Sequence, residues 1–235
     1  MSGLTAVDIR IYQIHYRADQ RTGLDPAFIP FDNTANLRPE WREYHVFREA
    51  HRAGLCAGDA IVGFVSWKFG LKTHVSGRDF VRFIARHPGH DVYFLNPRVE
   101  RGRFANVWLQ GEHHHPGIIG LAEEALRAAG TPMRLAELAH PPGMTLFCNF
   151  WAGTSRFWDR YMAFCEPVFA AIERGLPTDT MARLDARADR RIDACFRPFI
   201  MERLFTTLLA VDASIRWRRH PGRRRWLGGL GWRAA

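Results

Sequence analysis

The amino-acid sequence predicts an α/β fold, in which a single domain holds a mainly parallel central sheet flanked by helices. Three observations support this prediction. Short apolar runs of strand length alternate along the chain with longer segments whose apolar residues recur at helical spacing. The 235 residues, 47% of them hydrophobic, suffice for one sizeable core. The sequence shows no internal repeat and no second apolar region large enough for another domain.

Four segments are predicted to be strands. Residues 9–15 alternate apolar and polar side chains, which is typical of a strand with one buried face. Residues 60–66 form a continuous apolar run, as a fully buried strand does. Residues 91–95 are a third run, which Asn96 and Pro97 end, and residues 144–149 are the fourth.

Helical patterns occupy most of the remaining chain. Pro39 is expected to open a helix that continues to about residue 52, because proline costs nothing in a first turn. The segment from Ser76 to Asp79 has the character of a capping box. Ser155 is expected to cap a long amphipathic helix. Further helices are expected at residues 117–129 and about 196–208, and loops at 16–38 and 178–191.

The positive charge is concentrated at the C-terminus. The formal net charge is +9, and seven arginines but no acidic residue follow Asp212, so the rest of the chain carries about +2. Trp217, Trp226 and Trp232 lie among these arginines. We therefore expect a folded domain at residues 1–212 and a basic tail at 213–235 that binds the anionic inner-membrane surface. A solvated tail is the alternative, and nucleic acid is not an expected partner, because the basicity does not extend over the domain.

The cysteine pattern predicts a cytoplasmic protein. The four cysteines are widely spaced and form no C-x-x-C pair, which is typical of reduced thiols. No apolar run approaches the roughly 20 residues needed to span a bilayer, and the N-terminus lacks the pattern of a secretory signal. With the basic tail, the expected location is the cytoplasm, peripheral to the inner membrane.

Lysine is the rarest basic residue in the chain. Of 33 Lys and Arg residues only Lys68 and Lys72 are lysines, and both follow directly after the apolar run 60–66. A compact ammonium suits a single phosphate oxygen, whereas guanidinium is a planar fork. One interpretation is therefore a contact with a phosphate or a sugar acid at the carboxyl end of a strand. Chance survival in an arginine-rich composition is the other.

Three consecutive histidines follow Glu112. Adjacent histidines on an extended segment point to opposite sides, so at most two of His113, His114 and His115 can converge, and a zinc site is not predicted. They are expected either to contact a phosphate, a sugar hydroxyl or an acceptor, or to be plain surface residues. The chain has no G-x-G-x-x-G, P-loop or G-x-S-x-G motif, so Rossmann, P-loop and hydrolase interpretations lack support.

Eight segments, taken in order, resemble the bacterial capsular and exopolysaccharide glycosyltransferases that were long grouped as a domain of unknown function. Residues 63–69 resemble the family signature G-L-x-H-Y-R-R-Y-F, residues 107–115 resemble Q-Y-x-x-x-H-H, and residues 197–204 resemble R-x-x-G-F-x-x-E-R-L. The other five segments are residues 9–15, 32–44, 91–97, 148–151 and 157–161. Ser66 and Lys68 replace the histidine and first arginine of the signature, and Arg42-Glu43-Tyr44 replaces Cys-Glu-Leu. The chain therefore resembles a divergent member.

The resemblance implies a GT-A-like fold, of the nucleotide-diphospho-sugar transferase type, and a defined reaction. A sugar would pass from a nucleotide-sugar donor to a glycan or lipid-linked acceptor in bacterial surface polysaccharide biosynthesis. Because no Asp-x-Asp is present on a suitable strand end, no metal ligand is assigned, and a divalent Mg or Mn ion stays an open alternative. A catalytically inactive membrane- or partner-binding protein with the same fold is the alternative function.

Breaking a bond to a diphosphate requires positive groups, and activating an acceptor hydroxyl requires a base. The candidate bases are Asp91, Glu112 and Glu202. The candidate substrate-binding residues are His15, Glu43, Trp67, Lys68, Lys72, Gln110, His113, His114, Asn149 and Arg203. Structural alternatives are a strand start for Asp91, a strand-end role for Asn149, a core position for Trp67 and a helix ion pair for Glu202 and Arg203. The transferase interpretation requires the two lysines and the histidines to lie around one pocket that binds an anion.

Overall fold

The first predicted strand lies second from one edge of a six-stranded sheet. The computed structural model describes residues 7–97, 103–189 and 193–222. Its strands are β1 (Ile9–His15), β2 (Ile29–Asp32), β3 (Ile61–Ser66), β4 (Val92–Phe94), β5 (Trp151–Gly153) and β6 (Trp217–Arg219). They lie in the order β2-β1-β3-β5-β4-β6. β1 is parallel to β2 and β3, β4 is parallel to β6, and β5 is antiparallel to both its neighbours.

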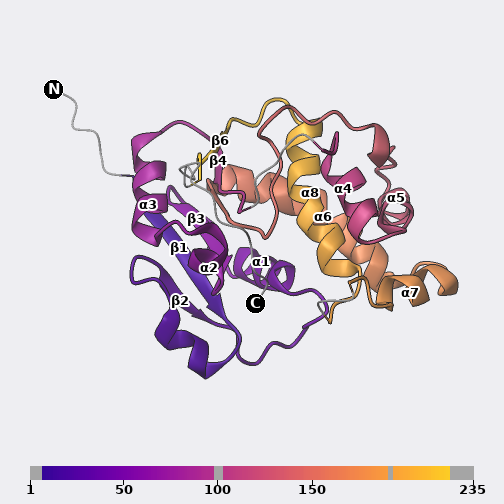
Figure 1. Ribbon diagram of the computed structural model, residues 1–235, viewed down its shortest axis with the longest axis horizontal. Coiled ribbons are helices and arrows are strands. Elements are labelled where there is room, and N and C mark those ends of the chain that lie inside the picture. The colour runs from indigo at the N-terminus through magenta and orange to yellow at the C-terminus, as the bar shows by residue number, and fades with distance from the viewer. Residues whose placement is uncertain (1–6, 98–102, 190–192, 223–235) are drawn as a thin grey trace, which may run out of the picture.

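Helices cover both faces of this sheet, which confirms the predicted α/β class with a mainly parallel sheet. The helices are α1 (Glu43–Arg52), α2 (Phe69–Thr73), α3 (Gly77–Arg86), α4 (Val107–His114), α5 (Ile118–Ala128), α6 (Ser155–Arg174), α7 (Thr178–Asp185) and α8 (Arg197–Val211). Two 3₁₀ turns, η1 (Ala18–Gly23) and η2 (Leu135–Glu137), complete the described elements. In Figure 1, α3 lies on one side of the strands, and α6 and α8 lie on the other with α4 and α5 beyond them.

Alternation along each strand divides the core in two. Ile61 and Val65 of β3 pack in a cluster with α2 and α3, whereas Val62 and Phe64 pack in a larger cluster with α1, α6 and α8. Several buried tryptophans belong to the larger cluster: Trp41, Trp108, Trp151 and Trp158. Burial of this aromatic layer is the main stabilising contribution of that face.

Helix starts follow the expected capping chemistry with small shifts. Ser76 accepts the backbone N–H of Asp79 at 3.1 Å, as the capping-box pattern predicts. The long helix α6 is capped by Thr154, which accepts the N–H of Phe157, and not by Ser155. Helix α1 begins at Glu43, later than Pro39, because Arg42 has φ of 49° and interrupts the helical path.

Four segments differ from the sequence-based expectation. Residues 144–149 are not a strand, because Cys148 and Asn149 adopt left-handed backbone angles, and the strand β5 follows at Trp151. The proline-rich segment after His15 contains β2, which pairs with β1. The charged segment 178–191 contains α7, and the three histidines lie at the end of helix α4, not on an extended segment.

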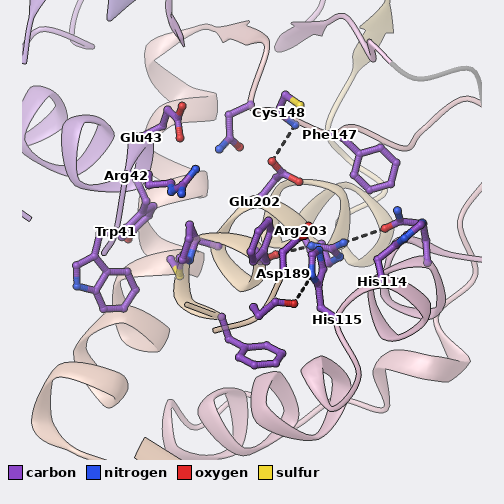
Figure 2. A pocket seen from close by; sticks show the side chains of 18 of the residues that line it. Trp41, Arg42, Glu43, His114, His115, Phe147, Cys148, Asp189, Glu202 and Arg203 are labelled. Carbon is purple, nitrogen blue, oxygen red and sulfur yellow. Dashed lines mark hydrogen bonds between the residues drawn. The ribbon is translucent and has the colours of Figure 1, made fainter. Parts of the chain in front are cut away.

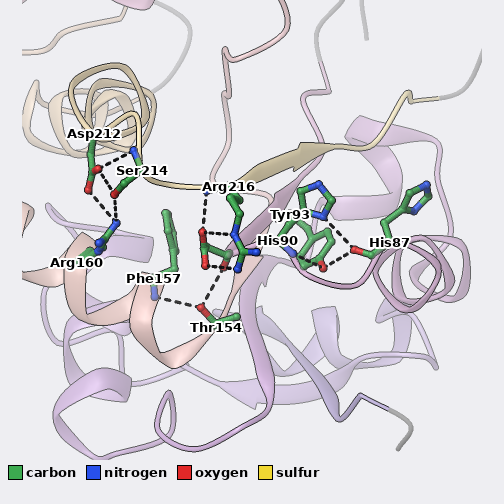
Figure 3. A network of polar contacts seen from close by, with 10 residues as sticks. His87, His90, Tyr93, Thr154, Phe157, Arg160, Asp212, Ser214 and Arg216 are labelled. Atoms are coloured by element: carbon green, nitrogen blue, oxygen red, sulfur yellow. Dashed lines mark hydrogen bonds and ion pairs between the residues drawn. The ribbon is translucent and has the colours of Figure 1, made fainter. Parts of the chain in front are cut away.

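The sheet extends past residue 212, where the sequence-based boundary of the folded domain falls. β6 pairs with β4, and the Asp91 carboxylate accepts the Arg216 backbone N–H at 2.7 Å and its guanidinium at 3.4 Å. Figure 3 shows Arg216 within this network of polar contacts. The remainder of the predicted tail, residues 223–235, lies outside the described residues. Within the described ranges, none of the helices combines the length and apolarity that crossing a bilayer requires.

Replacing Asp91 with asparagine tests the attachment of β6. Burial raises the pKa of Asp91, but the hydrogen bonds from Arg216 outweigh it and hold the pKa below its ordinary value. This contribution to stability is therefore present above about pH 4 and disappears as the pH falls through the lowered pKa. We expect Asp91→Asn to reduce the free energy of unfolding by about 1–2 kcal/mol at pH 7 and by progressively less as the pH falls through the lowered pKa, measured by urea denaturation.

Asp8→Asn is the matched control, because Asp8 forms an exposed ion pair with Arg10. Such pairs contribute roughly 0–1 kcal/mol. Equal losses in the two variants at pH 7 would contradict a special role for the Asp91–Arg216 contact.

Candidate functional site

A cavity of about 760 Å³ lies at the edge of the sheet where the parallel strands end. Ser66 reaches it from the carboxyl end of β3, and Cys148 and Asn149 reach it from the segment before β5. The start of α1 and the facing residues of α4 and α8 form its other walls. The chain passes from β2 back across β1 to β3 at this edge, and open α/β sheets bind ligands at such reversals.

Eight of the thirteen predicted site residues line this single cavity. Lys72 comes from α2, His113 and His114 from α4, and Glu202 from α8, so three helices that are distant in sequence contribute. The other four lining residues from the predicted set are Glu43, Gln110, Asn149 and Arg203. In Figure 2, Glu202 lies between Arg42 and Glu43 on one side and His114 and His115 on the other.

Three other predicted residues lie at or just after strand ends and do not line the cavity: His15, Trp67 and Lys68. Lys68 is exposed, and its ammonium lies 5.1 Å from the ring centroid of Trp67. Only one of the two lysines therefore meets the histidines, in contrast to the expectation that both would. His15 is 1% exposed, and neither of its ring nitrogens has a hydrogen-bond partner among the described residues.

Two of the predicted catalytic acids accept hydrogen bonds from backbone groups and do not line the cavity. Asp91 binds Arg216 at the opposite end of β4 and does not line the cavity. The Glu112 carboxylate accepts the backbone N–H groups of Gly117 at 2.6 Å and Ile119 at 3.0 Å, so it satisfies the first turn of α5. These positions leave Glu202, with Glu43, as the carboxylates from the predicted set that face the cavity.

Consecutive residues of α8 hold two different walls of the cavity. The buried Arg203 donates to the carbonyl oxygens of Val107 at 3.1 Å and Phe199 at 2.8 Å and to the Gln110 amide oxygen at 2.8 Å. Glu202 Oε2 accepts the backbone N–H of Cys148 at 2.9 Å. Arg203 therefore positions α4, and Glu202 positions the segment before β5.

Backbone strain is concentrated around the cavity. Among the described residues, five non-glycine residues have positive φ, and three of them line it: Arg42 at 49°, Cys148 at 68° and Asn149 at 52°. Each of these backbone conformations is unfavourable, so the surrounding contacts must stabilise it. Such positions cluster at functional sites. In addition, Asn149 is 7% exposed, and its Oδ1 has no hydrogen-bond partner among the described residues. An unsatisfied buried oxygen in a cavity wall indicates a place for a ligand donor.

The electrostatics of the cavity centre on Glu43. Desolvation raises the pKa of its carboxyl above the ordinary value, and the negative charge of Glu202 adds to the rise, while Arg42 and Lys72 oppose it. Burial, with the charge of Glu43, also raises the pKa of Tyr16, whose hydroxyl has no partner among the described residues. A carboxyl whose pKa is raised in a cavity is a candidate for proton transfer.

The sequence-based set omitted several lining residues. His115 stacks on Phe199 with ring centroids 4.0 Å apart, and its Nδ1 lies 2.9 Å from the Ala188 carbonyl oxygen. Because a carbonyl oxygen only accepts, Nδ1 carries the hydrogen, and burial lowers the pKa of His115 and favours its neutral form. Further omitted residues are Arg42, Cys148, Arg187 and Asp189. Arg42 stood out in the sequence only as a departure from the family motif, and no local pattern indicated that residues 187–189 return to His115.

Among the described residues, no group of three or more His, Cys, Asp or Glu side chains is placed to hold a metal ion. We therefore assign no metal ligand among these residues.

Comparison with known proteins gives one structural likeness. The apo structure of the bifunctional glycosyltransferase WbbM matches with a TM-score of 0.54 at 13% sequence identity. The match covers 90% of this chain but 44% of that one, so this chain spans less than half the length of its structural neighbour. At this identity the likeness concerns the fold, and the predicted α/β architecture is consistent with a glycosyltransferase fold. No protein-family model and no curated protein sequence matches the chain.

The packing of Arg203 against α4 gives a test of the cavity's construction. A Cβ added at Gly111 would come within 2.5 Å of Arg203 Nε, so Gly111→Ala must shift the guanidinium relative to its three acceptors. We expect a loss of about 1–3 kcal/mol in the free energy of unfolding, measured by urea denaturation.

Gly120→Ala is the control within a helix, because nothing lies within 4 Å of the added Cβ. In that exposed position alanine is expected to stabilise by up to about 1 kcal/mol through helix propensity. A neutral or stabilising Gly111→Ala would show that Arg203 does not need this close approach.

Proposed function

We propose that the chain is a glycosyltransferase that moves a sugar from a nucleotide-sugar donor to a glycan acceptor. The observation that carries the proposal is the convergence of the Lys72 ammonium, the Glu43 and Glu202 carboxylates and the α4 histidines on one cavity at the reversal of strand order. Its volume of about 760 Å³ falls in the range of ligand pockets. The likeness to the fold of a glycosyltransferase adds support.

The positive side chains are assigned to the leaving group. When the bond between sugar and diphosphate breaks, negative charge develops on the diphosphate and must be stabilised by fixed donors. Lys72 and Arg42 both line the cavity, and neither side chain is buried within the core. We assign them to the diphosphate. Arg203 is instead a positioning residue, because its guanidinium donates to acceptors on α4 and α8.

Glu43 is assigned as the base that accepts the proton of the acceptor hydroxyl. A base works best when its pKa lies near the working pH, and desolvation moves the Glu43 pKa in that direction. Glu202 supports it by its charge and by holding Cys148. Asn149 and the α4 histidines are assigned to sugar hydroxyls, since the unsatisfied Asn149 Oδ1 can accept a hydroxyl hydrogen.

The finer assignments follow the family resemblance. The acceptor is proposed to be lipid-linked, the pathway to be bacterial surface polysaccharide biosynthesis, and the fold to be GT-A-like. The basic segment from residue 213 onward would hold the enzyme at the cytoplasmic face of the inner membrane by attraction to anionic lipid.

An inactive protein of the same fold is the second candidate function. Ser66 and Lys68 replace the histidine and arginine of the family signature, and Lys68 lies outside the cavity. A thermal-shift screen with UDP, GDP, CDP and CMP separates the two. A ligand at 100 times its Kd adds about 2.7 kcal/mol of stability, so an absence of stabilisation at millimolar nucleotide would contradict the transferase proposal.

The two lysines of the chain provide a matched pair for testing the leaving-group assignment. Lys72→Ala removes an ammonium from the cavity and is expected to reduce kcat by about 10²-fold or more. Lys68→Ala removes a charge that is equally exposed but lies outside the cavity, and we expect activity within about threefold of wild type. Transfer of radiolabelled sugar measures both. The reverse ranking of the two variants would overturn the assignment.

The pH dependence of the rate tests the base. Because only the deprotonated carboxylate accepts a proton and the Glu43 pKa is raised, activity should fall on the acid side at a pH above the ordinary carboxyl range of about 4. Glu43→Gln should lose about 10²-fold or more in kcat/KM.

Glu202→Gln keeps an acceptor for the Cys148 N–H but removes the negative charge that raises the Glu43 pKa. The acid limb should therefore move to lower pH in this variant. If the acid limb of the pH–rate profile is unchanged in Glu202→Gln and Glu43→Gln keeps full activity, Glu43 is not the base.

A further inference from the structure

Cys148 differs from the other three cysteines in its surroundings. Burial raises the pKa of Cys56 to about 12 and raises the pKa values of Cys165 and Cys195 as well. Those three sulfurs are therefore poor nucleophiles at neutral pH. Cys148 is only half-buried, and it lies in the wall of the cavity.

A cation and a fixed backbone hold the Cys148 sulfur in place. The Lys72 ammonium donates to Sγ at 3.2 Å, and an adjacent ammonium favours the thiolate form of a cysteine. The backbone N–H of the same residue is held by Glu202 at 2.9 Å, so the side chain projects from a segment that cannot turn freely. The chain has two lysines, and one of them makes this contact.

A second observation indicates that this part of the wall receives small polar molecules. The neighbouring Asn149 is 7% exposed, and its Oδ1 has no partner among the described residues although it lines the same cavity. A small molecule with a hydroxyl or hydroperoxyl hydrogen can satisfy this oxygen beside the sulfur.

We propose that Cys148 is an oxidation site, at which a hydroperoxide converts the thiolate to a sulfenate. The sulfur attacks one peroxide oxygen, an S–O bond forms and the O–O bond breaks. The sulfur is oxidised by two electrons, and the other peroxide oxygen departs as hydroxide. With hydrogen peroxide, this hydroxide takes the proton of the new S–OH group and leaves as water, so that the sulfenate remains. The sulfenate oxygen stays beside Lys72, whose ammonium neutralises it.

Oxidation at this position has a consequence for ligand binding, which rests on the proposed function. Lys72 is assigned to the donor diphosphate, and a sulfenate at Cys148 competes for the same ammonium. The added oxygen also occupies space in the cavity wall. Oxidised protein should therefore bind nucleotide diphosphates more weakly than reduced protein, and a thiol reductant should restore binding, because sulfenic acids are reversible.

The reactivity itself is tested without any substrate. The full-length protein is treated with substoichiometric hydrogen peroxide and dimedone, and with iodoacetamide in a separate series, and the labelled peptides are quantified by mass spectrometry. We expect label at Cys148 about tenfold or more ahead of the other three cysteines, and a rate about tenfold lower in Lys72→Met. Lys68→Met is the matched control and should react as wild type does, because its ammonium lies over Trp67. Thermal melts establish that the variants are folded.

Each outcome decides the proposal. Labelling of Cys148 no faster than Cys195, or a rate unaffected by Lys72→Met, would overturn the oxidation site. The nucleotide arm is read separately: UDP, GDP or CDP should protect Cys148 from iodoacetamide, and peroxide treatment should weaken nucleotide binding in wild type but not in Cys148→Ser. Selective, Lys72-dependent labelling without protection by any nucleotide would keep the oxidation site and contradict the proposed donor site. Protection of Cys148 by a nucleotide without selective reactivity would support the proposed donor site and contradict the oxidation site.

Discussion

The arrangement of the cavity depends on the hydrogen bonds that the buried Arg203 makes between α8 and α4. Burying a guanidinium is costly unless its donors are satisfied, and here three acceptors from two helices meet that requirement. The geometry leaves no room for a side chain at Gly111, so the two helices approach closely at one defined register. Gln110 and the histidines that follow it on α4 are thereby fixed relative to Glu202, which precedes Arg203 on α8.

Glu202 connects α8 to the segment that precedes β5 of the sheet. Its hydrogen bond to the Cys148 N–H supports two consecutive left-handed residues, which alone would cost about 1–3 kcal/mol each. The left-handed turn brings Cys148 and Asn149 to the cavity and lets β5 start at Trp151, antiparallel to β3 and β4. The helical layer and the sheet edge therefore share one rigid wall, and the Lys72 ammonium at the sheet edge keeps a fixed position relative to the carboxylates of α1 and α8.

The sequence predicted the elements whose patterns are local. β1 and β3 follow from alternation and from a continuous apolar run, and the start of α3 follows from its capping residues. Residues 144–149 have strand-like composition, yet the strand fails there because a distant carboxylate, Glu202, stabilises a turn that no local pattern indicates. The same limit applies to the site. The scarcity of lysine drew attention to both Lys68 and Lys72, but only the short helix α2 decides that one faces the cavity and the other solvent.

The position of Glu43 shows which electrostatic effect dominates in the cavity. Glu43 is the first residue of α1, where the helix dipole favours the charged carboxylate by roughly 0.3–1 kcal/mol, and both Arg42 and Lys72 act in the same direction. The pKa of Glu43 is nevertheless raised, so desolvation together with the charge of Glu202 outweighs the backbone hydrogen bond and the charges of Arg42 and Lys72, which lower it. A carboxyl retained at such a position adds no stability to the fold in its charged form. The proposed role of Glu43 as a base would explain its presence, since removing a proton from a hydroxyl requires a base that is stronger than an ordinary solvated carboxylate.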